Sequence, residues 1–180
     1  MGTEIERKFL LASDDWRDEV SESTVLVQGY LSRGAESAIR VRIKGDTAHL
    51  NIKHTLDGIH RLEFEYPIPL ADARTLLDQV ALRPLIDKTR HHVRRGAHLW
   101  EIDEFHGANA GLIVAEIELE HADEAFQRPD WLGEEVSTDR CVFTIHPKEV
   151  LKTLPDDHLS KAFRRRVGDF EPSVGFFSVY

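Results

Sequence analysis

Acidic and basic side chains alternate with apolar ones near the start of the sequence. The stretch Glu4-Ile5-Glu6-Arg7-Lys8 places two carboxylates and an ammonium group at every second position. Because successive side chains of a β-strand point to opposite faces, Glu4, Glu6 and Lys8 would share one face. Carboxylates bind hard divalent cations and an ammonium group binds phosphate, so this face has the groups of a metal-and-phosphate site. Taken alone, the stretch is better explained as a strand with one face in water.

The same alternation of charged and apolar residues recurs along most of the chain. Strands are predicted at 3–11, 24–33, 37–44, 47–54, 58–67, 84–95, 97–105 and 112–121. Their charged positions include Arg40, Arg42, Lys53, Arg61, Glu63, Glu65, Lys88, Arg90, Glu101, Asp103, Glu116 and Glu118. The signs are sorted by strand, since the charged face of 37–44 carries only cations and that of 112–121 only carboxylates. Solvated faces normally mix the two signs, so the sorting favours two separate roles.

Charges sorted in this way suit phosphate chemistry. Clustered carboxylates bind Mg²⁺ or Mn²⁺, because hard cations prefer oxygen ligands. Clustered Arg and Lys side chains bind phosphate oxygens, Arg with two parallel hydrogen bonds and Lys as a point charge. A metal ion between carboxylates and phosphates is the recurring arrangement of phosphoryl-transfer sites. The sequence therefore predicts a site in which side chains bind both a metal and a phosphate chain.

Short turns must bring the predicted strands together. Turn residues such as Gly34, Gly45 and Gly96 separate them at short intervals, which is typical of antiparallel hairpins in a meander or barrel. A helix is predicted over 70–81 from the helical spacing of its apolar residues, and another near 146–154. If the sheet closes, the charged faces line a polar interior and the apolar faces pack outward.

Composition narrows the class of protein. The 180 residues suit one domain, and 41% apolar residues suffice for a folded core. The net charge of −9 argues against a general nucleic-acid binder. The longest apolar runs are only a few residues, so no membrane span is expected. The start lacks the pattern of a secretory signal, and Cys141 is the single cysteine, so we expect a cytoplasmic protein without disulfide bonds.

An ordered set of motifs resembles one known family, the CYTH domain or triphosphate tunnel metalloenzymes. The family hallmark is Glu-x-Glu-x-Lys on the first strand. The motifs that follow in the family's order are QGYL at 28–31, IRVR at 39–42, Lys53, RLEFE at 61–65, DKTR at 87–90, EID at 101–103, EIELE at 116–120 and WLGEEVSTDR at 131–140. The set covers roughly residues 3–140 and looks most like the short, single-domain bacterial members.

The resemblance implies an α+β fold that is mainly β. Its centre would be a closed eight-stranded antiparallel β-barrel, or tunnel, with a few flanking helices. The tunnel domain would span residues 1–163, with a C-terminal helix at about 144–163 that plugs one end. Residues 164–180 would form a tail. The family also implies a homodimer.

The resemblance also implies roles for individual residues. By position, the metal ligands for Mg²⁺ or Mn²⁺ would be Glu4, Glu6, Glu116 and Glu118. The phosphate contacts would be Lys8, Arg40, Arg42, Lys53, Arg61, Lys88, Arg90 and Arg140. Residues that hold the cations in place or bind a second metal would be Glu63, Glu65, Glu101 and Asp103. The catalytic lysines would be Lys53, Lys88 and Lys8; crowding by cations should lower the pKa of the first two.

The implied reaction is metal-dependent hydrolysis of a triphosphate, with inorganic tripolyphosphate as the leading substrate. Three alternatives remain open at this point: an adenylate cyclase of the same family, a thiamine triphosphatase, and a polyphosphate-binding module without activity. His91 and His92 would point to opposite faces of their strand, so at most one of them could enter the tunnel.

Overall fold

The computed structural model describes residues 2–34, 36–57 and 59–137. The strands are β1 (Gly2–Leu11), β2 (Val20–Arg33), β3 (Ser37–Lys44), β4 (Thr47–Asp57), β5 (His60–Pro67), β6 (Ile86–Arg95), β7 (His98–Phe105), β8 (Ile113–Leu119) and β9 (Leu132–Glu135). The described residues also form one α-helix, α1 (Leu70–Gln79), and two short 3₁₀ helices, η1 (Asp15–Glu19) and η2 (Gly107–Asn109). No helix in this part of the chain is long and apolar enough to cross a membrane.

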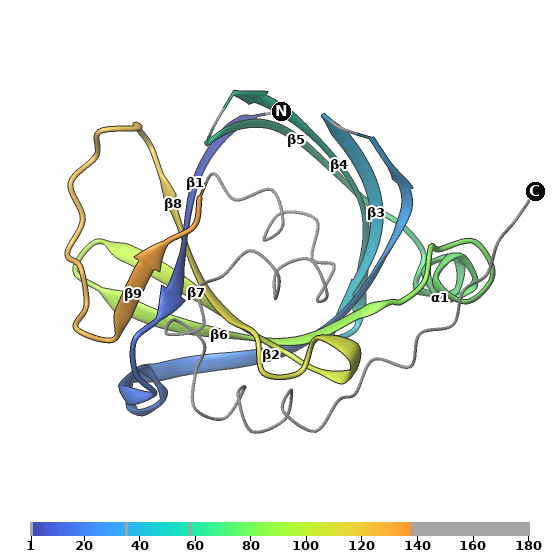
Figure 1. The fold of residues 1–180 in the computed structure, drawn as a ribbon. Helices are drawn as coiled ribbons and strands as arrows, with labels where there is room; N and C mark the ends of the chain where they lie inside the picture. The colour runs from blue at the N-terminus through green and yellow to red at the C-terminus, as the bar shows by residue number, and fades with distance from the viewer. Residues whose placement is uncertain (1, 35, 58, 138–180) are drawn as a thin grey trace, which may run out of the picture.

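Eight antiparallel strands close into a barrel (Figure 1). Their order is β5-β4-β3-β2-β6-β7-β8-β1, and β1 pairs back onto β5, where Glu4 lies opposite Arg61. β1 closes the barrel with only its first half. Beyond Ile5 its free edge is covered instead by β9, with Phe9 opposite Glu135. The predicted closed eight-stranded barrel is therefore confirmed.

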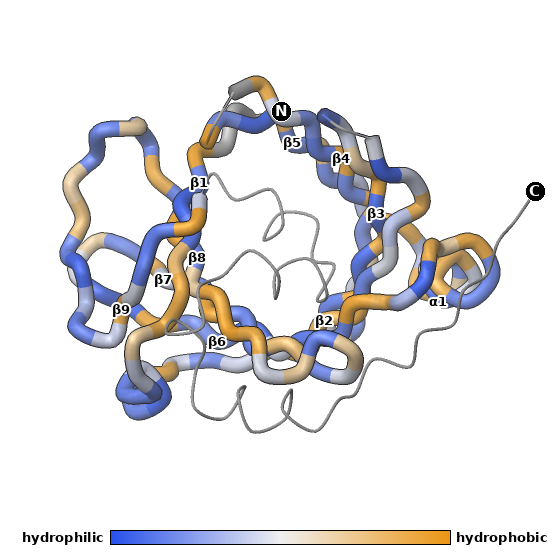
Figure 2. Tube along the Cα trace, viewed as in Figure 1, coloured by the Kyte–Doolittle hydropathy of each residue, from blue (hydrophilic) through white to orange (hydrophobic). Residues whose placement is uncertain are grey.

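The outer face of the barrel carries the apolar side chains. Helix α1 covers β2, β3 and β4, where its Ala73 and Leu77 pack with Val41 of β3. On the other side Trp16 and Trp100 belong to a second cluster, which the segment after β8 and strand β9 help to cover. Figure 2 shows hydrophilic and hydrophobic residues alternating along the strands. The alternation in the sequence thus places the charged side chains inside and most apolar ones outside. The exception is a third apolar cluster, whose members Leu10, Ile86, Phe105 and Val114 share the inward strand parity of Lys8, Lys88, Asp103 and Glu116.

The predicted elements match the structure except at their ends. Strand β6 begins at Ile86 rather than at residue 84, because Pro84 has no N–H to donate to a neighbouring strand. The predicted helix over 70–81 is confirmed and ends at Gln79. The prediction missed β9 and the two 3₁₀ helices, which are too short to show a period. The predictions for 144–163, including the helix near 146–154, and for 164–180 lie outside the described residues.

Candidate functional site

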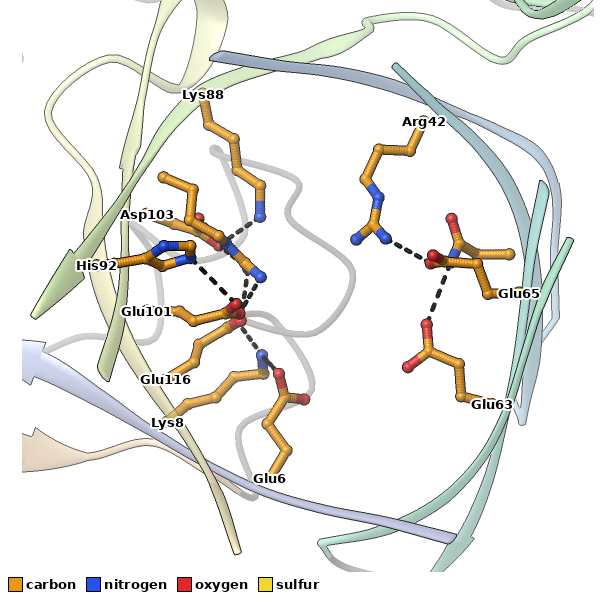
Figure 3. A network of polar contacts seen from close by, with 12 residues as sticks. Glu6, Lys8, Arg42, Glu63, Glu65, Lys88, His92, Glu101, Asp103 and Glu116 are labelled. Atoms are coloured by element: carbon orange, nitrogen blue, oxygen red, sulfur yellow. Dashed lines mark hydrogen bonds and ion pairs between the residues drawn. The ribbon is translucent and has the colours of Figure 1, made fainter. Parts of the chain in front are cut away.

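Two groups of charged side chains face each other across the barrel interior (Figure 3). One group comes from β1, β6, β7 and β8, and it includes Lys8, Lys88 and Glu116. The other comes from β3, β4 and β5, and it includes Arg42 and Glu65. Strand parity explains the arrangement, since these residues alternate with those that pack outside. The interior is therefore a charged tunnel.

Lys8 lies between two carboxylates on the wall formed by β1 and β8. Its Nζ is 3.0 Å from Glu6 Oε1 and also pairs with Glu116. Glu6 in turn accepts a hydrogen bond from the buried guanidinium of Arg61. Burial disfavours the charged ammonium, yet the carboxylates of Glu116 and Glu6 raise the pKa of Lys8. Lys8 is therefore a permanent positive charge.

The carboxylate of Asp103 is the buried anchor of the wall formed by β6 and β7. It is fully buried and accepts hydrogen bonds from Arg90 Nε at 2.8 Å and Nη2 at 2.7 Å, and another from Lys88. Arg90 also reaches Glu116 at 2.9 Å and pairs with Glu101. This geometry fits a scaffold role for Asp103, because its oxygens are already committed to two cations.

The amine of Lys88 has a strongly lowered pKa. Burial lowers the pKa of Lys88 from 10.5 to about 8, and the nearby charge of Arg90 also lowers it, while Asp103 opposes the change. The expected lowering of the Lys88 pKa is confirmed. Its main cause is burial, however, and crowding by cations is secondary. At mildly alkaline pH the side chain can therefore lose and regain a proton.

The opposite wall carries positive charge that is only partly compensated. Arg42 pairs with Glu65, but its Nε is buried and has no hydrogen-bond partner in residues 2–34, 36–57 and 59–137. Within the described part of the chain, the side chain of Arg40 forms no hydrogen bond or ion pair, and its Nε is also buried. Burial lowers the pKa of Arg42, and the charges of Arg40 and Arg90 lower it further. Cations held together at this cost in electrostatic energy are ready to bind an anion.

A neutral residue, Asn51, organises the carboxylates of β5. It is fully buried, and its Nδ2 donates hydrogen bonds to Glu63 at 3.2 Å and to Glu65. Glu63 also pairs with Lys53 at 2.9 Å. Asn51 is absent from the predicted site residues. Its strand parity, which it shares with Lys53, is the feature of the sequence that could have placed it in the tunnel.

Carboxylates dominate the side of the tunnel next to β7 and β8. A cavity of about 560 Å³ is lined there by Glu6, Glu101, Glu116, Glu118, Glu120, Glu124 and His98, among others. The side chain of Glu118 forms no hydrogen bond or ion pair within the described residues. Burial raises the pKa of Glu118, and the charges of Glu101 and Glu6 raise it further. A cation near Glu118 would relieve this repulsion.

The side chains as they stand do not form a complete metal site. Among residues 2–34, 36–57 and 59–137, no group of three Asp, Glu, His or Cys side chains is close enough to hold a metal ion. Glu6 and Glu116 point their oxygens at cationic side chains instead. The side chain of Glu4 and the whole of Arg140 lie outside what the structure describes. The donor types fit Mg²⁺ or Mn²⁺, because all are carboxylate oxygens.

The two adjacent histidines of β6 face opposite sides, as parity predicts. His92 enters the tunnel, where its Nε2 lies 3.5 Å from Glu101. His91 packs against Trp16 on the outside, with a ring-to-ring distance of 5.1 Å. Arg7 also faces outward, where it pairs with Glu135. These residues confirm which side of β6 and β1 lines the tunnel.

Sequence comparison identifies the family to which this tunnel belongs. The CYTH domain profile matches residues 2–145. The chain belongs to the CYTH domain family. It is 40% identical over 139 residues to an inorganic triphosphatase of Acetivibrio thermocellus, a match that covers 77% of this chain and 88% of the relative. It is 34% identical over 142 residues to an inorganic triphosphatase of Nitrosomonas europaea, covering 77% and 91% of the two chains.

A solved structure extends the likeness of this CYTH domain to three dimensions. The crystal structure of the inorganic triphosphatase NE1496 superposes with a TM-score of 0.58 and 30% sequence identity. The match covers 86% of this chain and 98% of that one. The family match over residues 2–145 includes all the strands that carry the charged tunnel.

Proposed function

We propose that this CYTH domain protein hydrolyses inorganic tripolyphosphate to pyrophosphate and orthophosphate inside the tunnel. The observation that carries the proposal is the cationic wall, where Arg40 is unpaired within the described residues and Arg42 is only partly paired. A polyanion is the ligand that would compensate these charges. Relatives with 40% and 34% identity that are named inorganic triphosphatase support the same substrate.

The phosphate chain would lie between the two charged walls. Arg40 and Arg42 would contact it from β3, Lys53 from β4, and Lys88 and Arg90 from β6. Lys8, with its raised pKa, would act as a fixed positive charge rather than as a base. Arg61 is held by Glu6, so we assign it to the scaffold together with Asp103.

A divalent cation, Mg²⁺ or Mn²⁺, would bind on the carboxylate side of the tunnel. Glu6, Glu116 and Glu118 would hold it, with Glu4 from the same face of β1. When bound, such an ion neutralises phosphate charge and polarises the phosphorus–oxygen bond. Glu118 is the best placed of these residues, because its side chain forms no hydrogen bond or ion pair with a described residue and its pKa is raised by burial and by neighbouring carboxylates, against only the weaker influence of Lys53.

Lys88 is the residue best suited to move the proton of the attacking water. With a pKa of about 8, the Lys88 amine is partly neutral at mildly alkaline pH. The carboxylate of Asp103 accepts a hydrogen bond from Lys88 Nζ and holds it in place. The water oxygen would form a bond to a terminal phosphorus as the bridging P–O bond breaks. The electron pair would leave on pyrophosphate, and the water proton would pass to Lys88 Nζ. Lys53 is the second candidate for proton transfer.

Parallel incubations would test the proposal against its rivals. The protein with Mg²⁺ or Mn²⁺ would be given tripolyphosphate, ATP or thiamine triphosphate, and phosphate and cyclic AMP would be measured. We expect phosphate release to be fastest from tripolyphosphate. Formation of cyclic AMP from ATP would indicate an adenylate cyclase. Faster phosphate release from thiamine triphosphate than from tripolyphosphate would indicate a thiamine triphosphatase. Tight binding of tripolyphosphate without any release would indicate a binding module.

A further inference from the structure

One polar side chain of the tunnel, Gln28 of β2, has no role in the site described so far. Its neighbour Gly29 faces the end of helix α1 and the segment after it, where an added Cβ would lie 3.0 Å from Leu77 Cδ2 and 2.7 Å from Ala81 Cβ. Val27, on the other side, packs in the same outer cluster. Because strand neighbours alternate, Gln28 points the other way, into the tunnel. It lies there without a charged residue on either side along its own strand, since Leu26 and Tyr30 share its face.

The amide of Gln28 is buried but unused. The residue is 2% exposed, and its Oε1 is buried without a hydrogen-bond partner among the described residues. No hydrogen bond of its side chain to any other residue is present within the described part of the chain. A buried amide oxygen without a donor is unfavourable, so such a group usually has a ligand or an ordered water as its partner. The missing partner is a hydrogen-bond donor.

Two cations of the site flank Gln28. Arg42 lies directly opposite it on β3, and Lys88 is the diagonal neighbour on β6, since Gln28 pairs with Ile86 and Leu26 pairs with Lys88. Side chains at these separations can reach a common point. Lys88 donates to Asp103 and Arg42 donates to Glu65, so neither cation satisfies the Gln28 oxygen. Lys88 and Arg42 project into the same interior space in Figure 3.

The chemistry of the reactants decides which donor could fill the gap. An ionised triphosphate offers only acceptor oxygens, so it cannot satisfy Gln28 Oε1. The attacking water has two O–H groups and can do so. We propose that Gln28 positions the attacking water, whose one O–H donates to Gln28 Oε1 while the other points to Lys88. This inference rests on the proposed triphosphatase function and adds a catalytic residue to it.

The contact with Gln28 does not change which bonds form and break in the hydrolysis or where the proton goes. The water oxygen forms the new bond to phosphorus, pyrophosphate takes the electron pair of the broken bond, and Lys88 Nζ receives the proton. Gln28 gains and loses no proton. It restricts the water to the orientation in which a lone pair of the water oxygen points at the phosphorus, in line with the breaking bond. A glutamine orients the attacking water in the same way in some nucleotide hydrolases.

Steady-state kinetics with tripolyphosphate would test the inference. Gln28→Met keeps the length of the side chain but removes the acceptor oxygen. We expect kcat to fall about 30-fold or more with KM within about twofold, because water rather than phosphate loses its partner. Gln28→Asn shortens the side chain by one methylene group and moves the oxygen away from the water, so it should lower kcat in the same way. Gln28→Glu keeps an acceptor oxygen, so it should recover most of kcat at the pH plateau while its charge raises KM.

The controls separate the possible outcomes. Gln79→Met makes the same change on the exposed end of α1 and should leave both constants unchanged. Thermal melting would identify a variant that fails to fold, in which case the more conservative Asn and Glu variants decide. A raised KM with normal kcat in Gln28→Met would make Gln28 a phosphate contact, and an unchanged variant would make it structural. Both results would overturn the inference. An inactive wild-type protein would instead refute the proposed function.

Discussion

The ionisation of Lys88 leads to a prediction that can be worked out quantitatively. A fall in pKa from 10.5 to about 8 corresponds to roughly 3 kcal/mol in favour of the neutral amine. At pH 7 about a tenth of such side chains are neutral, which is roughly 300-fold more than for an ordinary lysine. Since the base must be neutral, kcat/KM should rise with pH through about 8 and level off above it.

The bound substrate should shift this behaviour in a defined direction. A polyanion beside Lys88 favours its ammonium form, so the rise in kcat, which reports the complex, should occur at higher pH than the rise in kcat/KM. Both profiles would be measured by phosphate release between pH 6 and 10, with the metal ion kept in excess. Wild-type protein whose kcat/KM is flat between pH 6.5 and 9.5 would contradict the assignment.

Replacing the amine tests the same reasoning without relying on pH alone. Lys88→Arg keeps a positive charge beside Asp103, but a guanidinium does not lose its proton in this range. We expect kcat to fall about 10²–10⁴-fold, the usual contribution of a general base, and the rise near pH 8 to disappear. Lys44→Arg makes the same change at the end of β3 and should leave the rise in place. A Lys88→Arg protein within about threefold of wild type, with the rise retained, would refute the role of Lys88.

Two further predictions concern neighbouring faces of the same strands. Glu6→Ala removes the carboxylate that pairs with Lys8 and Arg61, and it should abolish tripolyphosphate turnover. Arg7→Ala on the outer face should keep kcat and lower the free energy of unfolding by only about 1 kcal/mol or less, as for other part-exposed ion pairs. Equal loss of turnover in both variants would contradict the assigned faces. Gly29→Ala should lower the unfolding free energy by about 1–3 kcal/mol, because the new Cβ would meet Ala81 at 2.7 Å. The added change Ala81→Gly should restore part of that loss in a thermal melt. No effect in either protein would mean that the segment after α1 does not pack this closely on Gly29.

The sequence by itself determined which residues form the strands and which of them face inward. This was possible because strand parity is a local property: the side chains of Arg40 and Val41 must point to opposite sides wherever the strand lies. The sorted charges also predicted that β3 and β8 have different roles. Strand β9 could not be predicted in the same way. Its four residues pair with β1 only because β5 leaves that edge uncovered.

Only the tertiary structure decided how the inward-facing groups affect one another. Asp103 looks like any other carboxylate of the sequence; its contact with Arg90 forms within the β6–β7 hairpin, but its complete burial depends on closure of the barrel. The lowered pKa of Lys88 likewise follows from burial, which closure of the sheet creates. The sequence also cannot tell whether the Gln28 amide has a hydrogen-bond partner, because that depends on all the residues that surround it in the folded barrel. Charge and parity are encoded residue by residue, whereas burial arises only when strands distant in the sequence close the barrel.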